Sequence, residues 1–129
     1  MATRHEDWLW QARRDLEHAR ASAEGSFFEW ACFASQQAAA KALKALFQRK
    51  RADAWGHSLA ELATVLPKDS QAPAELLEAA KELDKHYIPT RYPNALPHGS
   101  AGQSYTEGEA LRAIDHAEQI IRFCEGHIL

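Results

Sequence analysis

The sequence has few of the features that would indicate a secreted, membrane-spanning or disulfide-held protein. Among 129 residues there are two cysteines, Cys32 and Cys124, and both fall in helical patterns rather than in a spaced framework. Such thiols are typical of buried, unreactive side chains in a reducing compartment. No stretch approaches the ~20 apolar residues of a membrane span, and the N-terminus lacks a basic region followed by an apolar run. We therefore expect a cytoplasmic protein without membrane association.

Strand patterns, internal repeats, glycine-rich phosphate loops and nucleophile motifs are also missing. The seven histidines form no helical metal-ligand pair with an obvious third ligand, so we predict no metal site and no cofactor. His18, His116 and His127 are interpreted as solvated or capping side chains. The formal net charge of −3 gives no general attraction to nucleic acid. Any site for a polyanion must therefore be local.

Most of the chain shows helical periodicity. Apolar residues recur at helical spacing from about residue 4 to 24, from 73 to 87 and from 106 onward. Segment 27–49 is alanine-rich and apolar around most of its circumference, as expected of a central helix, and its narrow polar strip consists of Gln37, Lys41, Lys44 and Gln48. Capping-box spacing at Ser58–Glu61 and Thr106–Glu109 predicts two helix starts, the first helix ending near Pro67. Residues 99–102 are predicted to loosen the chain.

These segments together predict an all-α fold. We expect an antiparallel up-and-down helical bundle of about five helices, three of them long, forming a single domain over residues 1–129. The connections are expected to be short except around residues 88–105.

The segment from Tyr87 to His98 is the main candidate for a binding site. Pro89, Pro93 and Pro97 restrict φ and disfavour helical geometry before each proline, which predicts a stiffened strap that holds Arg91 outward. The combination suits a nucleotide or a single RNA strand, because bases stack on aromatic rings and arginine binds phosphate. A purely structural loop, with Tyr92 as a core plug, is the alternative. The candidate ligand-binding side chains of the segment are Tyr87, Thr90, Arg91, Tyr92 and Asn94, and His98 offers a titratable acid or base.

Two further positions could contact an anion. Lys41 opens a run of cations without an intervening acid, completed by Lys44, Arg49, Lys50 and Arg51. The run is interpreted either as an anion patch or as the solvated face and end of a helix. His57 precedes the helix start at Ser58, where unpaired N–H groups favour anions. The alternative there is a local cap with Trp55 packed over the end of the bundle.

The order of these blocks resembles the HEPN family, the small helical domains named for higher eukaryotes and prokaryotes nucleotide-binding. The resemblance covers nearly the whole chain. It rests on the blocks Ala12-x-x-Asp15-Leu16, Phe33 to Leu46, Gly56-His57-Ser58-Leu59, Leu83-Asp84 to Asn94, and Tyr105-Thr106-x-x-Glu109. It implies an up-and-down bundle that pairs as a homodimer and is often encoded beside a minimal nucleotidyltransferase with which it acts.

Members of such a family range from nucleotide-binding or accessory subunits to toxin ribonucleases. We expect a homodimeric module that binds nucleotide or RNA and acts with a nucleotidyltransferase partner, in a prokaryotic toxin–antitoxin setting. One alternative is a metal-independent endoribonuclease, in which Arg91 and His98, separated by six residues, meet across a dimer interface. Three other arginine–histidine pairs also fit the family's spacing: Arg13 with His18, Arg51 with His57, and Arg122 with His127. A helical interaction domain without a small-molecule ligand is the remaining alternative.

Overall fold

The computed structural model describes residues 4–128, and within them all regular structure is helical. The longest helices are α1 (His5–Glu24), α2 (Phe28–Arg49) and α6 (Glu107–Ile128), as the periodicity predicts. Three shorter α-helices are α3 (Leu59–Thr64), α4 (Ala74–Asp84) and α5 (Ala101–Ser104). Two 3-10 turns, η1 (Lys68–Ser70) and η2 (Pro93–Ala95), complete the described chain.

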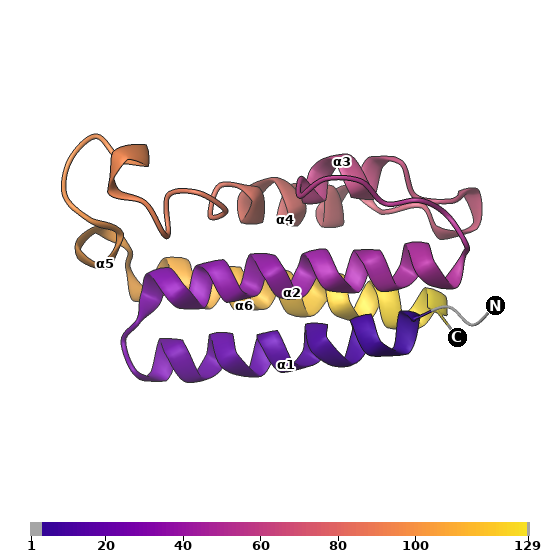
Figure 1. Ribbon diagram of the computed structural model, residues 1–129, viewed down its shortest axis with the longest axis horizontal. Helices are drawn as coiled ribbons and strands as arrows, with labels where there is room; N and C mark the ends of the chain where they lie inside the picture. The colour runs from indigo at the N-terminus through magenta and orange to yellow at the C-terminus, as the bar shows by residue number, and fades with distance from the viewer. Residues whose placement is uncertain (1–3, 129) are drawn as a thin grey trace.

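Helix α2 is the centre of the bundle. It packs against α1 and α6 along its length, and α3 and α4 form a further layer beyond it (Figure 1). Its alanines, including Ala31, Ala38 and Ala42, are fully buried, which permits close approach of the neighbouring helices. The predicted polar strip of α2 keeps some exposure, as do the first turn of the helix, Phe33 and Arg49. The all-helical bundle with a central second helix is therefore confirmed.

The ends of the helices show why the chain turns where it does. After α2, Arg51 adopts a left-handed φ of 56°. The N–H of Ala52 then donates to the carbonyl of Phe47 at 2.9 Å, and the N–H of Arg51 donates to the carbonyl of Gln48 at 3.1 Å. This is the Schellman arrangement, which satisfies the last carbonyls of a helix. It sends the connector 52–57 back toward α3.

The start of α3 is held by α4 as well as by its own cap. The Ser58 hydroxyl accepts a hydrogen bond from the N–H of Glu61 at 3.2 Å, as predicted. The carboxylate of Asp84, at the end of α4, accepts bonds from the N–H groups of Leu59 at 2.7 Å and Ala60 at 3.1 Å. It also accepts a hydrogen bond from the Ser58 hydroxyl at 3.0 Å. One side chain thus joins two helix ends.

Two predictions about the chain between α4 and α6 are wrong, and the predicted end of α4 is displaced. Residues 99–102 do not loosen the chain: Ser100 and Gln103 form a capping box that starts α5. The strap after α4 is a series of turns rather than an extended segment, because the N–H groups of Arg91 and Tyr92 both bond to the carbonyl of Ile88. Helix α4 itself ends at Asp84, three residues before the predicted end at Tyr87.

Candidate functional site

Arg91 lies among aromatic rings instead of projecting from the loop. Its guanidinium carbon is 4.4 Å from the ring centroid of Phe33, 4.7 Å from that of Tyr87 and 5.2 Å from that of Tyr92. Its Nε and Nη2 donate to the backbone carbonyl of Tyr87 at 3.0 and 2.6 Å. The aromatic faces and the carbonyl thus fix the guanidinium in one orientation. Its other edge makes no hydrogen bond within residues 4–128.

Tyr87 connects this cluster to the start of α3. Its ring stacks on His57 at 4.9 Å with an interplanar angle of 19°. The backbone of His57 is held in turn, because its carbonyl accepts a hydrogen bond from the buried Gln36 of α2 at 3.3 Å. The preceding Gly56 has a φ of +81°, a conformation that favours glycine. The turn at Gly56 therefore places an exposed imidazole over the Tyr87 ring.

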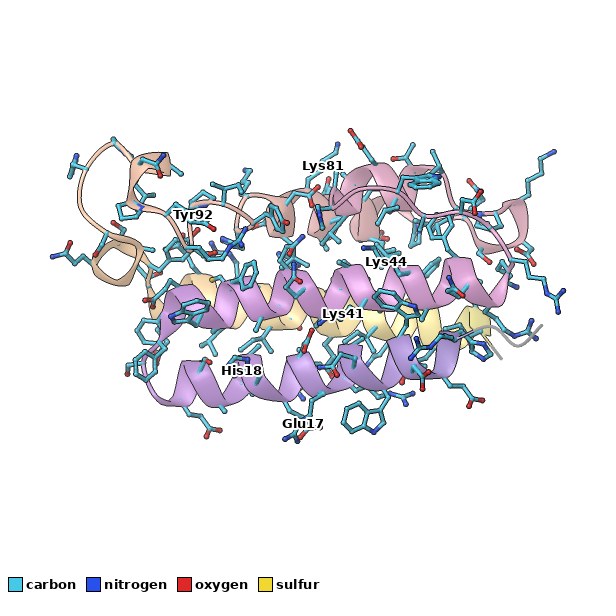
Figure 2. The ribbon with its side chains drawn as sticks, viewed as in Figure 1. Glu17, His18, Lys41, Lys44, Lys81 and Tyr92 are labelled. Carbon is cyan, nitrogen blue, oxygen red and sulfur yellow. The ribbon has the colours of Figure 1, made fainter. Side chains whose placement is uncertain are left out.

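A hollow of about 290 Å³ lies beside Arg91, between the first turn of α2 and the loop before α5. Tyr92, half exposed at its rim, is not the core plug considered from the sequence. In Figure 2 Tyr92 lies near the end of the bundle where α2 begins. The lining residues are Glu29, Trp30, Thr90, Arg91, Tyr92, Pro93, Ser100, Ala101 and Gly102.

The remaining loop residues do not all offer a free polar group to this hollow, and Asn94 and His98 do not line it. Thr90 is buried, and its hydroxyl donates to the carbonyl of His86 at 2.6 Å, so its side chain stabilises the turn. Asn94 and His98 are exposed. No hydrogen bond or ion pair joins His98 to Arg91 in the part of the chain that the structure describes.

The predicted basic run around Lys41 is divided among different partners. The Lys41 ammonium forms an ion pair with Asp15 of α1 at 2.6 Å, and Lys50 pairs with Asp69 at 3.0 Å. Arg49 donates to the carbonyl of Ile128 at 3.1 Å. The run is not one anion patch. Lys44, which lies 5.6 Å from the Trp8 ring centroid, has no carboxylate partner within residues 4–128.

A partly buried polar contact holds the opposite side of the loop. The Nδ1 of His86 and the hydroxyl of Tyr105 are 3.0 Å apart, which ties the end of α4 to the junction between α5 and α6. Burial lowers the pKa of His86 from its usual 6.5 and raises the pKa of Tyr105 to about 12. Burial also raises the pKa of the nearby Cys32 thiol to about 12. All three side chains are therefore neutral near pH 7.

Phe33, Trp30 and Asp84 contribute to the site although the sequence analysis did not assign them to it. Phe33 falls within segment 27–49, which the sequence shows to be apolar around most of its circumference, yet it lies under the Arg91 guanidinium. Its position on α2, four residues before Gln37 and eight before Lys41, places it on the polar strip and is a signal that could have identified it. Trp30 precedes it by one turn. No local signal identifies Asp84, because its partners are more than twenty residues away.

Neither a metal centre nor a membrane segment is found in residues 4–128. No group of three or more histidine, cysteine, aspartate or glutamate side chains is placed to hold a metal ion. None of the described helices has the length and apolar character needed to cross a bilayer.

The sequence model of the HEPN domain matches residues 5–127, nearly the whole chain. The chain belongs to the HEPN family. No curated protein matches it. Among solved structures, TT1696 from Thermus thermophilus is 50% identical, with a TM-score of 0.95 over 98% of this chain and 99% of that one.

Two other similar structures carry the family name themselves. The archaeal HEPN homologue ST0689 is 41% identical, with a TM-score of 0.85 over the full length of both chains. The HEPN domain protein tm0613 from Thermotoga maritima is 46% identical, with a TM-score of 0.76 over 93% of this chain and 95% of that one. The resemblance inferred from the sequence blocks is therefore confirmed, and this HEPN chain has the helical architecture of its relatives.

Proposed function

We propose that this HEPN chain is a homodimeric module that binds a nucleotide or single-stranded RNA through the Arg91 cluster and acts with a minimal nucleotidyltransferase. The supporting observation is the orientation of Arg91. One edge of its guanidinium is fixed on the Tyr87 carbonyl, and the side chain lines the 290 Å³ hollow. A fixed guanidinium loses less conformational entropy on binding phosphate than a mobile one.

The rings around Arg91 supply the second requirement of a nucleotide site. Tyr92 and Trp30 are exposed at 50% and 44% and line the same hollow. Exposed rings next to a cation allow a base to stack while its phosphate contacts the arginine. Asn94 follows Tyr92 closely in the loop and His57 stacks on Tyr87, and both are exposed hydrogen-bonding groups. Because Lys41 is paired with Asp15, its ammonium acts as a hydrogen-bond donor rather than as an unpaired charge.

The geometry favours binding over strand cleavage. A metal-independent ribonuclease needs a group that moves protons close to the charge-stabilising arginine. His98 could be that group only from a second copy, because no hydrogen bond or ion pair joins Arg91 and His98 in the described part of one chain. The proposal therefore assigns Arg91 to ligand binding and gives His98 no role within a single chain.

Replacement of Arg91 tests the proposal. We expect Arg91→Ala to weaken binding of AMP or a short single-stranded RNA by about ten-fold or more, measured by isothermal titration calorimetry, because it removes the phosphate donor. Arg91→Lys retains the charge without the fork and should give intermediate affinity. Arg20→Ala is the matched control, since Arg20 pairs with Glu118 between α1 and α6. Thermal unfolding of each variant verifies its fold.

Equal affinity of wild type and Arg91→Ala, or no binding by wild type, would contradict the proposal. The homodimer is tested by the solution mass of the chain from sedimentation equilibrium. The partner is tested by co-purification with the product of a neighbouring nucleotidyltransferase gene. A chain that stays monomeric and binds no such partner would support the simpler interpretation, a helical interaction domain without a small-molecule ligand.

A further inference from the structure

A second hollow, with aromatic walls, lies at the opposite end of α2 from Arg91. It has a volume of about 240 Å³ and is formed by the start of α1, the end of α2 and the connector before α3. In Figure 2 Lys44 lies toward this end of α2, whereas Tyr92 lies near the other. The lining residues are Trp8, Lys44, Phe47, Gln48, Ala52, Asp53, Ala54 and Trp55.

The two tryptophans of this hollow differ in how they are held. Trp8 is partly buried and packs against the hydrophobic core, so its ring is a fixed wall. Trp55 is 80% exposed, which leaves most of a large aromatic ring in water. Trp55 therefore does not pack over the end of the bundle, which was the alternative considered from the sequence. An exposed tryptophan opposite a fixed one suits a planar ring that stacks between or beside them.

Polar groups complete the hollow in a pattern that fits a nucleotide unit of RNA. Lys44 lies against the Trp8 ring and has no carboxylate partner in the described chain, so its ammonium can contact a phosphate. Gln48 and Asp53 are exposed at the wall and can hydrogen-bond base edges or ribose hydroxyls. The volume is below the roughly 300–1,000 Å³ of pockets for drug-sized ligands, which suits a single base.

The hollow is connected to the Arg91 cluster along one face of α2. Four hollows follow one another, and each neighbouring pair shares a lining residue: Trp30 joins the first to the second, Lys41 the second to the third, and Trp8 the third to the last. The α2 residues on this face are Trp30, Phe33, Gln37, Lys41, Lys44 and Gln48, spaced at three or four positions. Trp30 and Lys44 are separated by roughly 21 Å at the usual helical rise.

We propose that the Trp8–Lys44–Trp55 hollow is a second base-binding subsite, so that the ligand of this chain is an extended single strand of RNA rather than a mononucleotide. The inference rests on the proposed function, because the strand would begin at Arg91 and follow the α2 face to Trp55. In the middle of this path Asp15 offsets the charge of Lys41. Phosphate contacts are thus concentrated at the two ends.

Oligonucleotides of two lengths test the subsite. Fluorescein-labelled oligoadenylates of about three and about ten nucleotides are titrated with protein, and binding is measured by fluorescence anisotropy. We expect wild type to bind the longer strand at least five-fold more tightly. Trp55→Ala should weaken binding of the longer strand about five-fold or more and change that of the shorter less than two-fold, because only the longer one reaches Trp55.

Matched variants separate stacking from general effects of the substitution. Trp10→Ala removes another exposed tryptophan, on α1 but outside the hollow, and should leave both affinities unchanged. Trp55→Phe retains an aromatic face and should restore most of the affinity for the longer strand. Lys44→Gln should weaken binding of the longer strand, whereas Lys81→Gln on α4 should not. The exposure of Trp55 means that its loss does not disturb the core.

The outcomes distinguish this inference from the proposed function. If wild type binds neither strand, both fail. If Arg91→Ala weakens binding of both strands while Trp55→Ala changes neither, the subsite alone is overturned. A Trp55→Ala variant whose solution mass falls from dimer to monomer would make the hollow an interface between copies and would also overturn the subsite.

Discussion

The Arg91 side chain both stabilises the loop and borders the hollow. Its Nε and Nη2 satisfy the Tyr87 carbonyl just beyond the end of α4, where carbonyl groups lack helical partners. The aromatic contacts fix the plane of the guanidinium, and its other edge borders the hollow. The residue types of the loop make Arg91 a candidate in the sequence, and its role in ligand binding is the proposal made above. Of the rings that contact it, Tyr87 and Tyr92 are loop candidates too, but Phe33 could not be selected in the same way because it is more than fifty positions away along the chain.

His86 gives the loop a pH-dependent anchor. Burial lowers its pKa, while Glu109 and Glu82 act in the opposite direction and offset part of the effect. The unfolded chain therefore binds a proton at His86 more readily than the folded chain does. Because stability rises with pH wherever the unfolded state binds more protons, this residue lowers the free energy of unfolding as pH falls through and below about 6.5.

Substitution of His86 tests this anchor. We expect wild type to lose more free energy of unfolding than His86→Gln between about pH 7.5 and about pH 5.5, because glutamine cannot take up a proton. Urea denaturation at the two pH values measures both losses. Equal losses in the two proteins would show that the anchor does not titrate, and a larger loss in the variant would reverse the sign of the effect.

Helix α3 depends on its neighbour more than on its own sequence. It has six residues, too few for an isolated helix to be stable in water. Asp84 stabilises the helix from outside. Its carboxylate accepts hydrogen bonds from two backbone N–H groups at the α3 N-terminus, where the helix dipole favours an anion. The same contact fixes the turn that presents His57 to Tyr87.

Loss of the Asp84 carboxylate should therefore destabilise the α3–α4 layer. We expect Asp84→Ala to lower the free energy of unfolding by about 1–2 kcal/mol, the range of strong helix caps, as measured by chemical denaturation. Asp53→Ala, at an exposed connector position, should change stability by less than about 0.5 kcal/mol. Hydrogen exchange at Leu59 and Ala60 should accelerate only in Asp84→Ala. Unchanged exchange there would mean that α3 is capped by Ser58 alone.

Helices α1, α2, α4 and α6 could be predicted because each carries its periodicity over several turns. Helix α5 was missed for a local reason: it has four residues, with Gly99 just before it and Gly102 inside it, and its Ser100–Gln103 box lacks the following apolar run that marks the other starts. The turns after α4 were mistaken for extended chain because three prolines suggest it. There the hydrogen bonds of Thr90 and Arg91 to preceding carbonyls prevail over that preference.

The charge of the whole molecule limits how strongly it can attract RNA. The formal net charge is −3, and the cations of the outer helices are largely paired, as Arg13 is with Glu125 and Arg20 with Glu118. Arg91 and Lys44 remain as cations that border hollows without a carboxylate partner in residues 4–128. Affinity for a single strand should therefore come mainly from stacking and hydrogen bonding.

A shallow salt dependence follows for the longer oligoadenylate. Each phosphate contact to a single strand contributes about −0.7 to the slope of log K against log salt concentration, so two contacts predict a slope of about −1.4. Anisotropy titrations over a range of potassium chloride concentrations measure it. The slope should become about half as steep in Lys44→Gln. A slope steeper than about −3 would mean that further cations contact the strand.

The sequence by itself determined the helical class, the central position of α2, the main helix starts and the membership of the HEPN family, because these depend on periodicity and on short blocks in a fixed order. Only the tertiary structure decided which side chains meet. In it Arg91 contacts Phe33 and the Tyr87 carbonyl, Lys41 pairs with Asp15, and Trp55 is exposed in the same hollow as Trp8. Such contacts join residues far apart along the chain, and burial and packing across the bundle select them.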